Sequence, residues 1–123
     1  MIIKESAENY LESILVIKRQ RGVVRSIDIA NDLEVSKPSV SVAMKNFREE
    51  GYITVDENGH IDLTEKGLKI AERVYERHEI ISKTLMLLGV DEQTALNDSC
   101  KIEHVISEKS FERIKEFLEK HTK

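Results

Sequence analysis

Two short helices joined by a tight connection are the feature that most constrains the fold of this 123-residue chain. Ser26 has the residue type of an N-cap, and apolar residues at helical spacing follow it as far as position 33. Ser36 is the next predicted cap, and Pro38 lies in the first turn of a helix expected over residues 37–50, where the missing N–H is tolerated. The pattern predicts a helix-turn-helix.

A β-hairpin is expected directly after the second of these helices. Residues 52–55 and 60–63 have the composition of strands, and the turn between them ends in Asn58-Gly59. A hairpin in this place is a wing. A further amphipathic helix over residues 6–20 precedes the motif and supplies apolar residues for a shared core.

The second helix of a helix-turn-helix enters the DNA major groove, so its exposed residues are the expected contacts. Small polar side chains near its start can reach phosphates or base edges, and Val42 can touch a thymine methyl group. The residues predicted to contact DNA are Arg25, Ser36, Lys37, Pro38, Ser39, Ser41, Val42 and Lys45.

Charge limits how the chain can meet nucleic acid. The net charge is −4 and the pI is about 5.6, so any contact with DNA must come from a local face. Lys18, Arg19, Arg21 and Arg25 form a basic cluster that could meet backbone phosphate, but a solvated helix end is an equally good interpretation. A small helical core with an exposed hairpin is the alternative for this whole half of the chain.

The C-terminal half is predicted to be helical throughout, with caps at Thr64, Asp91 and Ser107. His78 lies within the apolar stripe of the first of these helices, a position more often taken by a core histidine than by a ligand. Cys100, Glu103 and His104 fall at i, i+3 and i+4, so one helical turn would direct a thiolate, a carboxylate and an imidazole the same way. That is the spacing of metal ligands, and it makes His78 a stronger candidate for a ligand of the same ion.

These elements predict a mainly α fold in two domains. A winged helix-turn-helix DNA-binding domain is expected over residues 1–72, and an all-helical dimerisation and metal-binding domain over residues 73–123. Apolar stripes on such a short helical set leave a face uncovered, which favours a two-fold homodimer on a palindromic double-stranded operator. One cysteine and no signal-like or membrane-spanning stretch favour a cytoplasmic protein without a membrane partner.

Several motifs together resemble the metal-dependent repressors typified by the diphtheria toxin repressor and the manganese transport regulator. The matching segments run through the chain, and the two most specific lie at residues 77–79 and 97–104; the others are residues 9–12, 36–41 and 63–67. The resemblance is to the short form, which lacks a C-terminal SH3-like domain. It implies metal ligands at Glu12, His78, Cys100, Glu103 and His104, with a contribution from Asn9.

The chain departs from both branches of that family at two implied ligand positions. The manganese-responsive branch has aspartate at position 9 and glutamate at position 100, and the iron-responsive branch has methionine and cysteine, whereas this chain has Asn9 and Cys100. Leu96 and Ser82 stand where the iron branch has ligands of its other site. A thiolate suits Fe(II), Co(II), Ni(II) or Zn(II) better than Mn(II), so Fe(II) is the first choice for the physiological metal and Mn(II) the second.

The expected function is a repressor of metal-homeostasis genes with a divalent metal as corepressor, and not an enzyme. Three alternatives stay open at this point. A metal-independent winged-helix regulator would bind its operator equally well with chelator present. A metalloenzyme would need a catalytic constellation that the sequence does not show, since Ser82 breaks the His-Glu-x-x-His pattern of zinc hydrolases that His78-Glu79 begins. A structural zinc site would unfold when the metal is removed.

Overall fold

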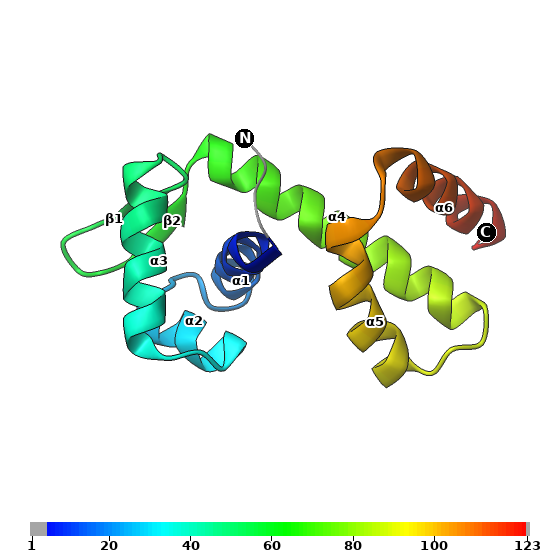
Figure 1. Ribbon diagram of the computed structural model, residues 1–123, viewed down its shortest axis with the longest axis horizontal. Helices are drawn as coiled ribbons and strands as arrows, with labels where there is room; N and C mark the ends of the chain where they lie inside the picture. The colour runs from blue at the N-terminus through cyan, green and yellow to red at the C-terminus, as the bar shows by residue number, and fades with distance from the viewer. Residues whose placement is uncertain (1–4, 123) are drawn as a thin grey trace. The chain divides into compact units, whose positions relative to one another are not determined.

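A computed structural model of the chain describes residues 5–122 and confirms the predicted mainly α fold with a winged helix-turn-helix (Figure 1). Within that range the elements are α1 (Glu5–Arg21), α2 (Ser26–Leu33), α3 (Lys37–Glu49), β1 (Ile53–Val55), β2 (Ile61–Leu63), α4 (Glu65–Leu87), α5 (Glu92–Val105) and α6 (Glu108–His121). The chain divides into two compact units, Met1–Glu72 and Arg73–Lys123. No helix among residues 5–122 is long and apolar enough to cross a membrane.

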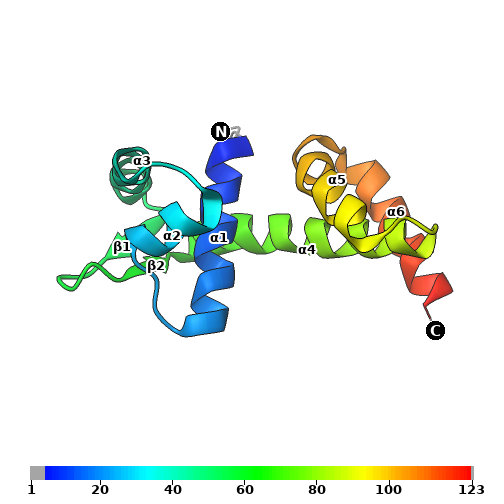
Figure 2. The same cartoon turned by 90° about the horizontal axis from the view of Figure 1, so that it is seen from below.

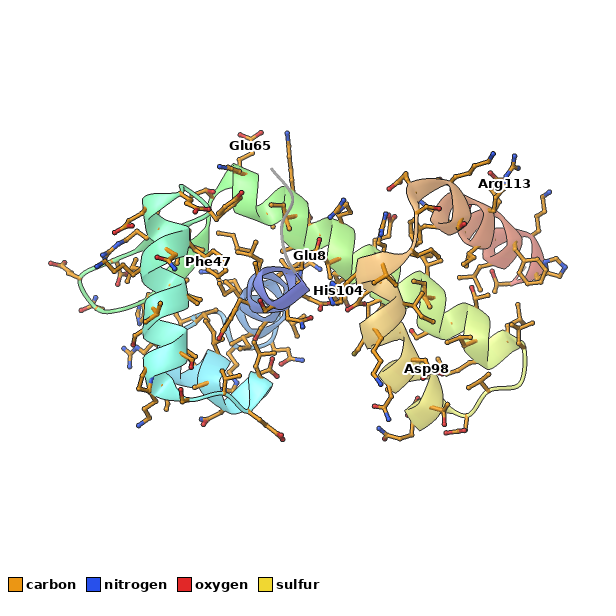
Figure 3. All side chains as sticks on the ribbon, in the orientation of Figure 1. Glu8, Phe47, Glu65, Asp98, His104 and Arg113 are labelled. Atoms are coloured by element: carbon orange, nitrogen blue, oxygen red, sulfur yellow. The ribbon has the colours of Figure 1, made fainter. Side chains whose placement is uncertain are left out.

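The core of the first unit is built from one apolar face of each of its elements. Phe47 of α3, which is labelled in Figure 3, contacts two tyrosine rings edge to face. The distance between ring centroids is 6.0 Å to Tyr10 of α1 and 6.2 Å to Tyr52. Edge-to-face contact is the favoured arrangement of aromatic pairs. The fully buried aliphatic side chains of this unit include Leu11, Ile14, Val24, Ile29, Val40, Ile53 and Ile61.

Helix α2 begins one residue earlier than the cap prediction allowed. Arg25, not Ser26, occupies the N-cap position, and its backbone N–H donates to Asp28 Oδ2 at 2.9 Å. The carboxylate three residues into the helix satisfies this N–H, so Ser26 becomes the first helical residue and its hydroxyl is not the cap. The helix ends at Leu33, and its C-cap residue Glu34 adopts a left-handed conformation with φ of 56°.

Helix α3 has the predicted start. Ser36 Oγ accepts a hydrogen bond from the backbone N–H of Ser39 at 3.2 Å, and Pro38 lies in the first turn. The wing follows as an antiparallel pair in which Thr54 faces Asp62, and each strand begins one residue later than predicted. Figures 1 and 2 show the turn of this hairpin projecting away from α1.

A close backbone approach joins the wing to α4. Thr64 Oγ1 accepts the backbone N–H of Gly67 at 3.2 Å, which confirms Thr64 as the cap, and donates to the carbonyl of Gly51 at 2.6 Å. A Cβ atom on Gly67 would lie 2.1 Å from the carbonyl oxygen of Tyr52. Only glycine fits here, because any side chain would collide with that backbone oxygen.

In the second unit, α5 and α6 both lie alongside the C-terminal part of α4 (Figure 2). Both predicted caps are confirmed: Asp91 Oδ2 accepts the N–H of Thr94 at 3.0 Å, and Ser107 Oγ accepts the N–H of Ser110 at 3.1 Å. The buried apolar side chains of this unit include Val74, Ile81, Ala95, Phe111 and Leu118.

Candidate metal centre and nucleic-acid interface

The predicted DNA contacts on α3 occupy the face opposite its buried stripe. Val40, Met44 and Phe47 are buried, which leaves the positions between them turned outward. Val42 is 62% exposed and so presents a methyl-bearing surface to solvent. The other exposed residues of the predicted set on this helix are Lys37, Pro38, Ser39, Ser41 and Lys45.

Two predicted contacts flank α3. Ser36 lies at the N-terminus of the helix, where its hydroxyl also donates to Ser39 Oγ at 2.8 Å. Arg25 is exposed at the start of α2, with Nη2 3.1 Å from His60 Nε2 beside the wing. His60 in turn lies 3.5 Å from Asp56, a carboxylate whose pKa is lowered chiefly by the backbone N–H of His60. This hydrogen bond to the charged form of the carboxylate stabilises the turn of the wing.

The basic cluster at the end of α1 is largely paired within the first unit. Lys18 Nζ lies 2.7 Å from Asp62, Arg19 lies 3.5 Å from Glu72, and Arg21 lies 3.3 Å from Asp28. These ion pairs are exposed and individually weak, but they neutralise much of the positive charge that phosphate would meet. Of the two interpretations left open by the sequence, they favour the solvated helix end.

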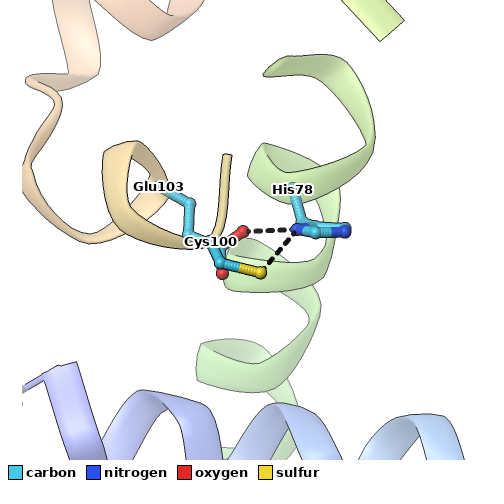
Figure 4. A group of neighbouring side chains, drawn as sticks. All are labelled: His78, Cys100 and Glu103. Atoms are coloured by element: carbon cyan, nitrogen blue, oxygen red, sulfur yellow. Dashed lines mark hydrogen bonds and ion pairs between the residues drawn. The ribbon is translucent and has the colours of Figure 1, made fainter. Parts of the chain in front are cut away.

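Three candidate metal ligands converge in the second unit. His78 projects from α4, and Cys100 and Glu103 project toward it from α5 (Figure 4). The Nδ1 atom of His78 is 3.0 Å from Glu103 Oε2 and 3.9 Å from Cys100 Sγ. One ligand atom from each residue lies within 4.8 Å of the other two, which is close enough for all three to reach one ion.

The burial of Glu103 is a physical reason to expect a cation. Its side chain is 1% exposed, while that of His78 is 21% exposed. Glu103 Oε1 accepts no hydrogen bond among the described residues, although His104 Nε2 lies 3.4 Å away. An ion-pair distance alone does not satisfy a desolvated carboxylate oxygen, so Oε1 is left in need of a further positive partner. Carboxylate, imidazole and thiolate together are a donor set that fits a divalent transition metal.

His104 does not join the cluster of three but faces the other oxygen of Glu103. Its side chain is 1% exposed and lies on α5, where Figure 3 labels it. The carboxylate of Glu103 therefore stands between two imidazoles, with Oε2 toward His78 and Oε1 toward His104. Of the ligands predicted on one turn of α5, Cys100 and Glu103 meet His78, whereas His104 faces the other oxygen of Glu103.

Asn9 and Glu12 lie on α1 in the first unit, three residues apart, and both are half-buried. This spacing places them on one face of the helix. Their role as ligands, which rests on the family resemblance, stays a prediction.

Two polar residues beside the cluster were not found from the sequence. Ser99 is completely buried, and its Oγ donates to the carbonyl of Leu96 at 3.0 Å and lies 3.3 Å from His78 Nδ1. Arg77 is also buried and donates to the backbone carbonyl of Glu103 at 3.2 Å. The available signals were spacing and adjacency: Ser99 precedes Glu103 by one helical turn, and Arg77 is next to His78.

Comparison with known proteins gives two family matches. The profile described as "Iron dependent repressor, N-terminal DNA binding domain" matches residues 3–61. The profile described as "Iron dependent repressor, metal binding and dimerisation domain" matches residues 64–123. Together they span nearly the whole chain.

Two relatives are similar over most of their length. An uncharacterized HTH-type transcriptional regulator of Methanocaldococcus jannaschii is 35% identical over 96% of both chains. The HTH-type transcriptional regulator MntR of Lysinibacillus sphaericus is 33% identical over 93% of this chain and 82% of its own.

A solved structure shares the fold. The structure of the manganese regulator SloR has a TM-score of 0.80 and 28% identity, covering 92% of this chain. This chain spans 53% of the length of that structure.

Proposed function

This chain belongs to the family of iron-dependent repressors, metal-controlled DNA-binding regulators of transcription, and we propose that Fe(II) or, second, Mn(II) is its corepressor, held by His78, Cys100 and Glu103. The observation that supports this most is the convergence of three ligand atoms from α4 and α5 within 4.8 Å. The genes controlled would be those of metal homeostasis.

The preference for Fe(II) follows from the donor set. Cys100 supplies a soft sulfur, which suits Fe(II), Co(II), Ni(II) and Zn(II) better than Mn(II). Manganese stands second because a structural relative is named a manganese regulator and because Glu103 and an asparagine oxygen are hard ligands. Zn(II), Co(II) and Ni(II) would also bind in vitro, since their affinity for such sites generally exceeds that of Fe(II).

We further propose that Glu12, Asn9 and His104 complete the coordination. Glu12 and Asn9 belong to α1, whereas the cluster belongs to α4 and α5, so a shared ion would couple the DNA-binding unit to the metal-binding unit. A ligand that binds one conformation better shifts the population toward it, here by a coupling free energy of about 1–3 kcal/mol. The ion would then hold α1, and the DNA-binding unit to which it belongs, in the conformation that binds DNA.

The second unit carries exposed apolar side chains that fit a two-fold dimer. Leu88 is 68% exposed, Val105 is 79% exposed and Phe117 is 40% exposed. Covering such side chains in an interface removes apolar surface from water. A two-fold dimer would place two copies of α3 about 34 Å apart on a palindromic operator, with the residues from Arg25 to Lys45 named above as contacts.

The test is an anaerobic binding titration on an operator duplex selected from random DNA. Binding would be measured with chelator, Fe(II), Mn(II) and Zn(II) for the wild type, His78→Ala and Cys100→Glu. We expect metal-dependent binding that His78→Ala abolishes, and a response that Cys100→Glu moves from Fe(II) toward Mn(II), because the substitution replaces a soft ligand with a hard one.

Glu112→Ala is the control, because this side chain is exposed on α6 and belongs neither to the metal cluster nor to the exposed apolar residues that fit the dimer. It should behave as the wild type. If the folded protein binds the operator equally well with chelator and with metal, the proposal is refuted and the chain is a metal-independent winged-helix regulator. Unfolding on metal removal would indicate a structural site instead.

A further inference from the structure

Arg77 is a buried cation directly beside the metal cluster. It precedes His78 on α4, and its side chain is 8% exposed. Arginine is almost never fully buried unless its charge and donors are paired. The groups that pair with Arg77 therefore show what this residue holds in place.

The guanidinium joins three segments of the second unit. Nη1 donates to the backbone carbonyls of Glu103 at 3.2 Å and Ile106 at 2.9 Å. Nη2 donates to Glu108 Oε2 at 2.9 Å, and the guanidinium carbon lies 5.3 Å from the centre of the Phe111 ring. One side chain thus contacts the end of α5, the connection after it and the start of α6.

The backbone carbonyls that accept from Arg77 are not satisfied by the hydrogen bonds of the helix itself. The last carbonyls of a helix have no partner within the helix, and α5 ends at Val105. Arg77 supplies donors for two carbonyls at this end, and one of them belongs to the residue whose carboxylate faces His78. Among residues 5–122 the buried Nε atom has no hydrogen-bond partner, so the guanidinium is held by its contacts with the two carbonyls and Glu108 although one of its donors is unsatisfied.

We infer that Arg77 is a positioning residue for the metal site, which holds the backbone of Glu103 so that its carboxylate meets His78 and Cys100. The inference rests on the proposed function and extends it, because Arg77 touches no candidate ligand atom and acts through Glu103. The chain neighbour of Arg77 is His78, so the same residue links the ligands of α4 and α5. Residues behind a metal ligand commonly fix its orientation and its affinity for the ion.

The experiment is an anaerobic Co(II) titration of the full chain followed by visible and near-ultraviolet absorption. The variants are Arg77→Met, which keeps a long side chain without donors, and Arg77→Lys, which keeps the charge but not the planar fork. Glu108→Gln removes the ion pair and leaves the two carbonyl contacts. Arg113→Met is the matched control, because Arg113 is 72% exposed on α6 (Figure 3).

We expect Arg77→Met to lower Co(II) affinity roughly 10- to 100-fold and to change the cobalt spectrum, the size of effect typical of residues behind the ligands. Arg77→Lys should fall between this variant and the wild type, while Glu108→Gln and Arg113→Met should keep wild-type affinity and spectrum. Thermal unfolding of the metal-free proteins reports any loss of stability separately. A merely structural role would lower the melting temperature and leave the spectrum of bound cobalt unchanged.

Wild-type affinity and spectrum in folded Arg77→Met would overturn the inference. If that variant does not fold, Arg77→Lys decides in the same way. A loss in Glu108→Gln as large as in Arg77→Met would also overturn it, since the ion pair and not the backbone anchor would then be responsible. If the wild type itself binds no Co(II), the proposed metal site fails rather than the role of Arg77.

Discussion

Most of the predicted DNA contacts of the first unit lie on the exposed face of one helix, α3, whereas the candidate metal ligands of the second unit come from two helices and are partly buried. On α3, Val42 is 62% exposed and the neighbouring polar residues are solvated. In the metal cluster, Glu103 is 1% exposed and faces two imidazoles. A surface of the first kind requires only a stable helix beneath it. A site of the second kind holds desolvated charge that its neighbours must balance.

The largest effect should come from removing that buried charge. Glu103→Gln keeps the shape of the side chain but takes away the carboxylate that faces both His78 and His104. We expect metal affinity to fall more than about 100-fold, beyond the 10- to 100-fold typical of outer partners. Isothermal titration with Mn(II) and anaerobic Fe(II) measures it.

Glu112→Gln, at an exposed position of α6, is the control and should bind as the wild type. Metal affinity unchanged in Glu103→Gln would show that the buried carboxylate is not a ligand, and the contrast between the two units would disappear.

A purely steric change should affect the first unit next most strongly. In Gly67→Ala the new Cβ would lie 2.1 Å from the carbonyl oxygen of Tyr52, so backbone must move. We expect a loss of about 2–3 kcal/mol in the free energy of unfolding, the upper range for overpacking. Chemical denaturation followed by circular dichroism measures it, with Lys69→Ala at an exposed position of the same helix as the control. A denaturation midpoint equal to that of the wild type would contradict the close approach.

Paired cap substitutions compare the two units directly. Ser36→Ala removes the cap of α3, and Ser107→Ala removes the cap of α6. Each should cost about 1 kcal/mol in the free energy of unfolding, because one backbone N–H at each helix start loses its acceptor. Hydrogen exchange should locate the loss at α3 in the first variant and at α6 in the second. Equal loss of protection at both helices in either variant would show that the units do not respond separately.

Acidification should give the smallest effect. The backbone N–H of Thr94 donates to Asp91 and lowers the pKa of its carboxyl below the ordinary value of 3.8. The folded state therefore binds this proton less readily than the unfolded state, so the stabilisation is fully present above that value and is lost as the pH falls through the lower folded pKa. Asp91→Asn should remove this part of the acid dependence of thermal unfolding. An acid dependence identical to that of the wild type would contradict it.

Local patterns were sufficient where one residue acts on a neighbour three or four positions away. Ser36, Thr64, Asp91 and Ser107 were predicted as caps and act as caps, because the hydroxyl or carboxyl needs only the next turn of backbone. The cap predicted at Ser26 was wrong for a local reason too, because Asp28 satisfies the N–H of Arg25 and the helix therefore begins one residue earlier. The winged helix-turn-helix followed from such signals.

The sequence by itself determined the order of the elements, their apolar faces and the turn that carries Cys100, Glu103 and His104, because helical spacing depends only on chain geometry. Only the tertiary structure decided that Cys100 and Glu103 meet His78 while His104 meets the opposite oxygen of Glu103, and that Arg77 and Ser99 lie behind the cluster. Apart from the contact between Glu103 and His104, these contacts join residues 21 to 26 positions apart on two helices. Their formation depends on how α4 and α5 pack, which no local pattern specifies.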